Sequence, residues 1–294
     1  MSRLGILLAL VAFVALCAPP PTAAQTCAIG GHNETSESFA PGGWTTAPAT
    51  PGFVLGAPVG SHLLFSEVAP RGFGTGAGSD SSEYVEIFNP TPRSVRLDDK
   101  YVADELGYFR TVNGAYPAAN ATDFVLRFPA GLALNPGRTL VLCVTKAGFA
   151  ASGATAPAAQ IFLEMRDSNG NPLDDMTLVT TVSTFPLSGG MLTNPSATNG
   201  EWLVLFCWSG TSDLTGDIDY ASWGANSATN PKMTKTGIAI DGPDADALTS
   251  AFLPDTAPAG QTNLGVALNK PNTFQRVGPE GGETSPGGHG CVGR

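Results

Sequence analysis

Apolar residues in this chain either alternate with polar ones at period two or gather in short runs bounded by Gly, Pro, Asn and Ser. Few windows show the 3.6-residue period of an amphipathic helix. Alternation is typical of a strand buried on one face, and a short apolar run is typical of a strand buried on both. We therefore predict an all-β fold, with strands over residues 61–69, 82–89, 94–97, 121–128, 138–145, 159–166, 176–183, 201–208, 216–223 and 272–278.

Three stretches depart from the strand pattern. Asn169-Gly170 favours positive φ and predicts a tight hairpin between the strands on either side. Residues 25–60 are rich in Gly, Pro, Thr and Ser and contain no strong strand, so we expect an extended segment lying on the domain. Residues 224–271 predict a long loop region with one short helical turn around Asp244–Ala251. Loops of this length are usually functional or are held by other contacts.

The strand at 82–89 carries Glu83 and Glu86, which raises the question of a catalytic acid/base pair. Successive side chains of a strand point to opposite faces, so these two glutamates cannot converge from a regular strand. A glycosidase needs two carboxyls roughly 5–10 Å apart across one substrate. The glutamates are therefore predicted to be structural, and the following Asn89-Pro90 step is predicted to be a turn.

Four blocks of sequence resemble the lamin tail domain family. They are LLFSEVAP (63–70) with SEYVEIFNPTPRSVRLDDKYVADE (82–105), then LALNPGRTLVLC (132–143), LTGDIDYASWG (214–224) and TFQRV (273–277). Their order and spacing match the family over roughly residues 62–280. The chain departs from the family at Tyr101, where Trp is commoner, and in long inserts at 146–160 and 225–271.

This resemblance implies an immunoglobulin-like β-sandwich with long loop insertions. The family occurs in nuclear lamins, in exported bacterial surface proteins and beside extracellular nucleases. It has no catalytic constellation to carry over, so the resemblance implies a fold and no active site.

The first residues have the composition of a secretory signal peptide. Arg3 precedes an apolar run from Leu4 to Ala18, and small residues lead to a predicted cleavage after Ala24. The run is too short for a stable membrane span. A lipoprotein alternative would cut before Cys17, where Leu16 is a poor match. We therefore expect a secreted or cell-surface protein with an extended segment at 25–61, a sandwich at 62–280 and a Gly-rich tail at 281–294.

Charge narrows the classes of partner. The chain has 15 Lys and Arg against 25 Asp and Glu, a formal net charge of −10. This charge repels phosphates and anionic lipid heads, so we expect no nucleic acid partner and no membrane insertion. A protein or glycan at the cell envelope or in the extracellular matrix is the expected partner.

Four cysteines remain after removal of the signal peptide, which predicts two disulfides in an exported chain. Cys143 and Cys207 lie in apolar runs, whereas Cys27 and Cys291 lie in Gly-rich ends. We therefore predict pairing of like with like. A zinc site made by the terminal cysteines with His32 and His289 is the alternative, but their spacings are not those of a standard zinc module.

The sequence offers candidates for a calcium site and for an aromatic ligand-contact surface. Oxygen ligands for calcium are offered by two sets of aspartates, namely Asp213, Asp217 and Asp219, or Asp241, Asp244 and Asp246. Aromatic residues expected in loops could contact a ligand or simply cap the sandwich, and these are Phe73, Tyr108, Phe109 and Tyr116. The three histidines of the mature chain do not lie in a Ser or Cys context that suggests a triad.

The sequence thus predicts a secreted, non-enzymatic module that presents loops from a rigid sandwich, with no required cofactor. An extracellular hydrolase, or a calcium-dependent accessory domain of one, is the alternative.

Overall fold

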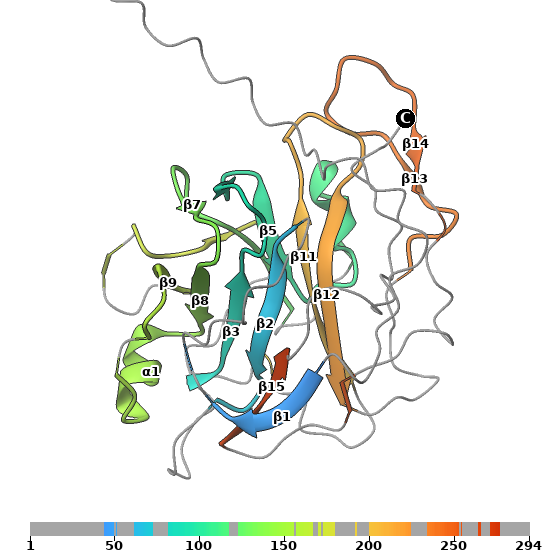
Figure 1. The fold of residues 1–294 in the computed structure, drawn as a ribbon. Coiled ribbons are helices and arrows are strands. Elements are labelled where there is room, and N and C mark those ends of the chain that lie inside the picture. Colours follow the sequence, from blue (N-terminus) through green and yellow to red (C-terminus); the bar gives the residue numbers. More distant parts are fainter. Residues whose placement is uncertain are drawn as a thin grey trace, which may run out of the picture.

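The fold is given by a computed structural model, in which the described residues are 44–49, 51, 62–72, 82–117, 123–155, 157–166, 170–171, 173–179, 192, 200–224, 234–252, 254, 264–265 and 271–276. Most of their regular structure is strand (Figure 1). The prediction of an all-β fold is confirmed. Within the described residues, no helix is long and apolar enough to cross a membrane.

Among the described residues, the larger of the two main sheets has six strands. Their order is β1 (Trp44–Pro48), β15 (Asn272–Arg276), β2 (Leu64–Ala69), β3 (Tyr84–Phe88), β8 (Thr139–Cys143) and β9 (Ile161–Glu164). Neighbouring strands are antiparallel, except that β9 runs parallel to β8. The last strand of the described residues, β15, therefore lies between β1 and β2 and joins the two ends of the described chain.

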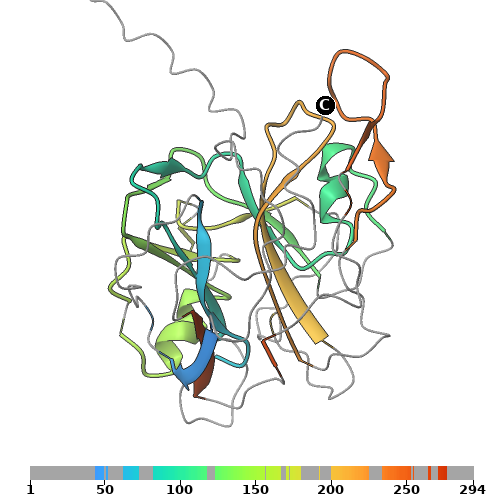
Figure 2. The same cartoon turned by 45° about the vertical axis from the view of Figure 1, so that its right-hand side comes forward.

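The second sheet has five antiparallel strands in the part of the chain that the structure describes. Their order is β10 (Thr177–Leu178), β6 (Val125–Arg127), β5 (Lys100–Ala103), β11 (Gly200–Cys207) and β12 (Gly216–Gly224). Two small ribbons pair β4 (Val95–Arg96) with β7 (Ala133–Leu134), and β13 (Ala239–Ile240) with β14 (Ser250–Ala251). Figure 2 shows the two main sheets as separate layers.

The main hydrophobic core lies between the sheets. Phe65, Val85 and Leu142 of the first sheet and Leu203 and Leu205 of the second belong to one buried cluster. The two sheets therefore pack face to face as a sandwich, which is the architecture that buries one face of each sheet.

The second sheet is also buried on its outer face. Trp202, Val204 and Phe206 alternate with the inward residues of β11 and belong to a second cluster. The short helix η3 (Tyr108–Val112) and the β13–β14 ribbon complete this cluster and lie beside the sheet in both views (Figures 1 and 2). Burial on both sides explains why β11 reads as an almost continuous apolar run.

A smaller cluster covers part of the outer face of the first sheet. Helix α1 (Lys146–Ala151) places Phe149 against Tyr84 and Cys143 in a third, smaller cluster. The rings of Phe149 and Tyr84 meet edge to face with centroids 5.9 Å apart.

Each of the ten predicted strands overlaps an observed one, but several other local predictions are wrong. Residues 44–48 form β1 inside the stretch expected to lack a strand. Residues 250–251 form β14 where a helical turn was expected. Gly170 has φ +77°, as a turn requires, yet the flanking strands β9 and β10 lie in different sheets and do not form a hairpin.

The predicted bridge between Cys143 and Cys207 is wrong. Cys143 is a free, buried thiol, whereas Cys207 is disulfide-bonded. Strand parity gives the reason: Leu142 faces the core between the sheets, so its neighbour Cys143 faces outward, while Cys207 faces inward. The other two cysteines of the prediction, Cys27 and Cys291, lie outside the described residues.

A buried ion pair joins the two sheets across the core. Arg276 of β15 donates from Nη2 to Asp219 Oδ2 of β12 at 2.9 Å, and from Nε to the Phe65 carbonyl at 2.8 Å. Asp219 Oδ2 also accepts the Phe65 amide at 2.5 Å. Both charged side chains are almost fully buried. Each charge therefore depends on the other for compensation in the low-dielectric core.

We expect Arg276→Met to lower the free energy of unfolding by about 3–5 kcal/mol, because it leaves Asp219 buried and unpaired. The matched control is Arg96→Met in the exposed Arg96–Asp98 pair, which should lower the free energy of unfolding far less, because solvent screens that pair. Urea unfolding of the full chain measures both. Equal losses in the two variants would contradict the role of the buried pair.

Candidate functional site

The glutamates of the first sheet are held in structural hydrogen bonds on two different faces. Glu83 Oε2 accepts the Leu192 amide at 3.1 Å on the core side. Glu86 lies on the outer side, where Ser66 Oγ donates to its Oε2 at 3.5 Å. Glu67, its cross-strand neighbour, accepts at Oε1 from Thr273 Oγ1 at 2.6 Å. The structure therefore separates Glu83 from Glu86, as strand alternation predicts.

Asp217 of β12 lies in the outer cluster of the second sheet. Its Oδ2 is 2.5 Å from Lys235 Nζ, and its Oδ1 accepts from the Tyr108 hydroxyl at 2.5 Å. Lys235 Nζ is also 2.8 Å from that hydroxyl oxygen. Asp217 is thus committed to this buried group and Asp219 to Arg276, so neither joins the predicted calcium site with Asp213.

Asp213 holds a surface loop, residues 241–249. Its Oδ1 accepts the Gly242 amide at 2.8 Å and its Oδ2 accepts from Ser250 Oγ at 2.7 Å. Those hydrogen bonds, with Ser250 first, lower the pKa of Asp213. A Cβ at position 242 would lie 2.6 Å from Asp213 Cα, so this close approach requires glycine.

Asp213, Asp241 and Asp244 form a carboxylate cluster that mixes the two predicted sets. One oxygen of each lies within 4.8 Å of those of the others. Asp246 instead accepts the Leu248 amide within the loop at 2.8 Å. The arrangement offers oxygen ligands, but both oxygens of Asp213 already accept hydrogen bonds from the protein. Calcium binding here stays a prediction.

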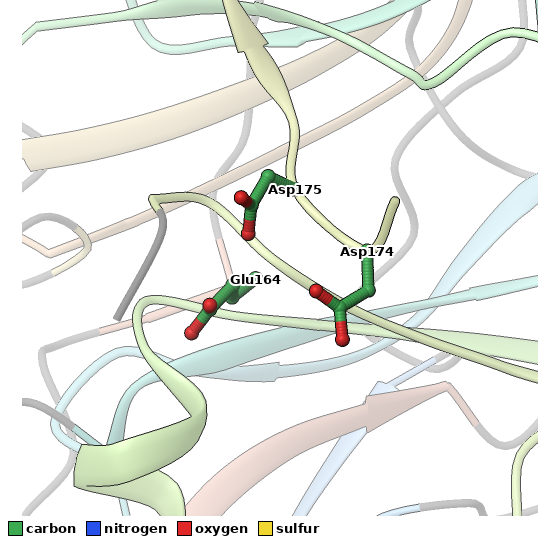
Figure 3. A group of neighbouring side chains, drawn as sticks. All are labelled: Glu164, Asp174 and Asp175. Carbon is green, nitrogen blue, oxygen red and sulfur yellow. The ribbon is translucent and has the colours of Figure 1, made fainter. Parts of the chain in front are cut away.

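A second carboxylate cluster was not predicted from the sequence. Glu164 at the end of β9 lies near Asp174 and Asp175, which precede β10 (Figure 3). Their ligand atoms also lie within 4.8 Å of one another. Lys146 supplies compensating contacts, since its amide donates to Glu164 Oε2 at 2.7 Å and its ammonium pairs with Asp174. The cluster therefore serves to fix the start of α1 to β9.

Two carboxyls of the second sheet have raised pKa values. Burial, with a smaller contribution from the charge of Asp123, raises the pKa of Glu201 to about 8. Burial followed by the charges of Glu201 and Asp123 raises the pKa of Asp104. A raised carboxyl pKa is a feature of general acids, and it is also a common result of burial. Sequence reasoning missed the group of Asp104, Asp123 and Glu201, because these residues come from three separate segments.

The aromatic residues expected to contact a ligand mostly lie inside. Tyr108 and Phe109 are buried in the outer cluster, where they pack with residues of the second sheet. The Phe109 ring meets Phe252 edge to face, with centroids 5.6 Å apart. Tyr116 is half-buried and its hydroxyl lies 2.9 Å from Thr111 Oγ1. Phe73 lies outside the described residues.

The chain has little similarity to known proteins. No family model matches the chain, and no curated protein matches it. Among solved structures, it is similar to a DUF4876 family protein from Bacteroides thetaiotaomicron, whose crystal structure has 2.50 Å resolution. The two are 14% identical with a TM-score of 0.35, and the match covers 57% of this chain and 55% of that chain. The chain thus spans about half the length of that protein, and so weak a likeness carries no function across.

The raised pKa of Glu201 predicts a pH dependence of stability. Between the ordinary carboxyl pKa and about 8, the folded state keeps a proton that the unfolded state has released, so the free energy of unfolding falls as pH rises through this range. Glu201→Gln removes this dependence and should flatten the decline. Urea titrations at several pH values measure the difference, and parallel pH profiles for variant and wild type would contradict it.

Proposed function

We propose that this chain is an exported, non-enzymatic module that binds a protein or glycan through the loop at residues 241–249. The observation that carries the proposal is the combination of an exposed loop with a fixed base. All residues of the loop except half-buried Gly242 are exposed, while Ile240 before it and Phe252 after it are buried.

The base of the loop is held by three kinds of contact. The ribbon pairs Ile240 with Ser250, and the Phe252 amide donates to the Ile238 carbonyl at 3.0 Å. Asp213, in the connection between β11 and β12, binds Gly242 of the loop and Ser250 of β14. Exposed loops on rigid scaffolds are disproportionately used for recognition, because little conformational entropy remains to be lost on binding.

The chemistry of the loop indicates the kind of surface it would bind. Its sequence, DGPDADALT, contains three aspartates and no basic residue. Leu248 is 74% exposed within it. An apolar contact beside negative charges suits a partner with cationic or donor groups around an apolar spot. Such groups occur on proteins and on amino-bearing glycans.

Export and fold support the same proposal. The signal-peptide composition of residues 1–24 supports secretion or retention at the cell surface. The resemblance to lamin tail domains and the two packed sheets support an immunoglobulin-like sandwich as the platform. The net charge of −10 argues against nucleic acid and anionic membranes as partners.

A hydrolase acting on extracellular polymers is the second candidate, and one observation favours it. Glu201, whose pKa is raised to about 8, keeps its proton at neutral pH as a general acid requires. In that case Glu201→Gln would abolish the release of soluble fragments from envelope polysaccharide. Under the preferred proposal, neither wild type nor variant releases any.

The binding proposal predicts different effects for two exposed leucines. Leu248→Ser should weaken binding about tenfold or more, since burying a leucine contributes about 1.5–3 kcal/mol. Leu173→Ser is the matched control, because Leu173 is 79% exposed but lies outside the loop, and it should bind as wild type. Immobilised full-length variants are compared for the amount of each envelope protein or glycan that they retain.

Equal retention by both variants would refute the role of the loop. A parallel arm with chelator tests the calcium-dependent alternative. If wild type loses binding on chelation and recovers it with calcium, the cluster of Asp213, Asp241 and Asp244 acts through the ion.

A further inference from the structure

Lys235 places its amine inside the protein rather than in solvent. The side chain is 1% exposed, and that of its partner Asp217 is 3% exposed. Lysine is rarely buried to this degree, because its charge loses hydration and needs full compensation. The compensation here comes from Asp217, whose Oδ2 lies 2.5 Å from Nζ.

The surroundings of this pair are aromatic. Lys235 Nζ lies 5.4 Å from the centroid of the Tyr108 ring and 5.5 Å from that of Phe252. Trp202 and Phe206 belong to the same buried cluster. A charged pair in such an interior is costly, whereas a neutral product of the same two groups has no charge to desolvate.

A third group touches both members of the pair. The Tyr108 hydroxyl donates to Asp217 Oδ1 at 2.5 Å and accepts from Lys235 Nζ at 2.8 Å. The three side chains come from β12, η3 and the segment before β13, so the fold itself brings them together. Amine, carboxyl and proton donor are thus held in contact, with the gain in rate that fixed proximity gives.

We propose that Lys235 and Asp217 become joined by an intramolecular amide bond between Nζ and Cγ. The bond makes the attachment of the segment before β13 covalent, and it stands independently of what the loop at 241–249 binds.

The reaction is a condensation that balances without any other reagent. A proton first passes from the ammonium to Asp217 Oδ2, which gives a neutral amine and a neutral carboxyl. The lone pair of Nζ attacks Cγ, the C–N bond forms, and the carbonyl electron pair moves to Oδ1. There the Tyr108 hydroxyl donates its hydrogen bond to the developing negative charge, as an oxyanion-hole donor does.

Collapse of this intermediate restores the carbonyl at Oδ1 and breaks the bond from Cγ to Oδ2. A second proton from Nζ goes to Oδ2, which leaves as water. Two of the three ammonium protons thus depart with the water and one stays on the amide. Nothing is oxidised or reduced, and two buried charges disappear.

Mass spectrometry of the full chain, denatured and reduced, tests the bond directly. Lys235→Arg is the matched control, because it keeps the positive charge beside Asp217 but does not form this amide. After correction for the substitution itself, wild type is expected to be lighter than the variant by one water molecule. Tandem spectra of a digest should contain a branched peptide that joins Lys235 to Asp217.

A double variant, Asp217→Ala with Lys235→Met, removes both charges and so leaves no unpaired charge buried. It serves as a second control in case the single variant misfolds. It should match Lys235→Arg in showing no loss of water. Tyr108→Phe should contain less of the joined form than wild type at equal times after purification. Its formation at the wild-type rate would overturn the role given to Tyr108. Folded wild type at the unjoined mass, without a branched peptide, would overturn the bond itself.

Discussion

The second sheet is buried on both faces, and this double burial positions the outer layer of the molecule. On β11, Leu203 and Leu205 pack against the first sheet, while Trp202, Val204 and Phe206 support the outer cluster. Without the apolar outer face of β11, η3 and the β13–β14 ribbon would have nothing to pack against. The exposed loop at 241–249 is therefore an extension of a packed layer. Apolar burial of Ile240 and Phe252 and the polar contacts of Asp213 together set its position.

Polar groups inside this structure connect layers that apolar packing has already brought together. Arg276 and Asp219 join the two sheets across the inner core. Lys235 and Asp217 join the outer layer to the second sheet. As ion pairs they contribute little net stability, because the desolvation of two charges offsets most of their attraction. Both aspartates come from β12 two residues apart, and they serve layers on opposite sides of the sheet where β11 and β12 shift register.

The sequence predicts the strands well because period-two alternation reports burial directly. It predicts poorly which residues contact one another where the apolar run is continuous. In TLVLC both faces of β8 are apolar, so the sequence does not indicate which residues face the core between the sheets. The prediction that Cys143 pairs with Cys207 fails for this reason. Local pattern is equally uninformative for Tyr108 and Phe109, whose contacts Asp217 and Phe252 lie more than 100 positions away along the chain. Asp217 and Asp219 looked like calcium ligands because no local pattern reveals Lys235 or Arg276 opposite them. The resemblance to lamin tail domains, and with it the immunoglobulin-like topology, stays a prediction.

Hydrogen exchange of the full chain, measured amide by amide, tests most directly whether the loop has a fixed base. The amides of Gly242 and Phe252 donate to Asp213 and to the Ile238 carbonyl, so we expect them to exchange far more slowly than those of an unstructured peptide. Their protection should approach that of the amides in β11. Exchange at these two positions as fast as in a free peptide would contradict it, because the loop would then have no fixed base from which to present its exposed residues.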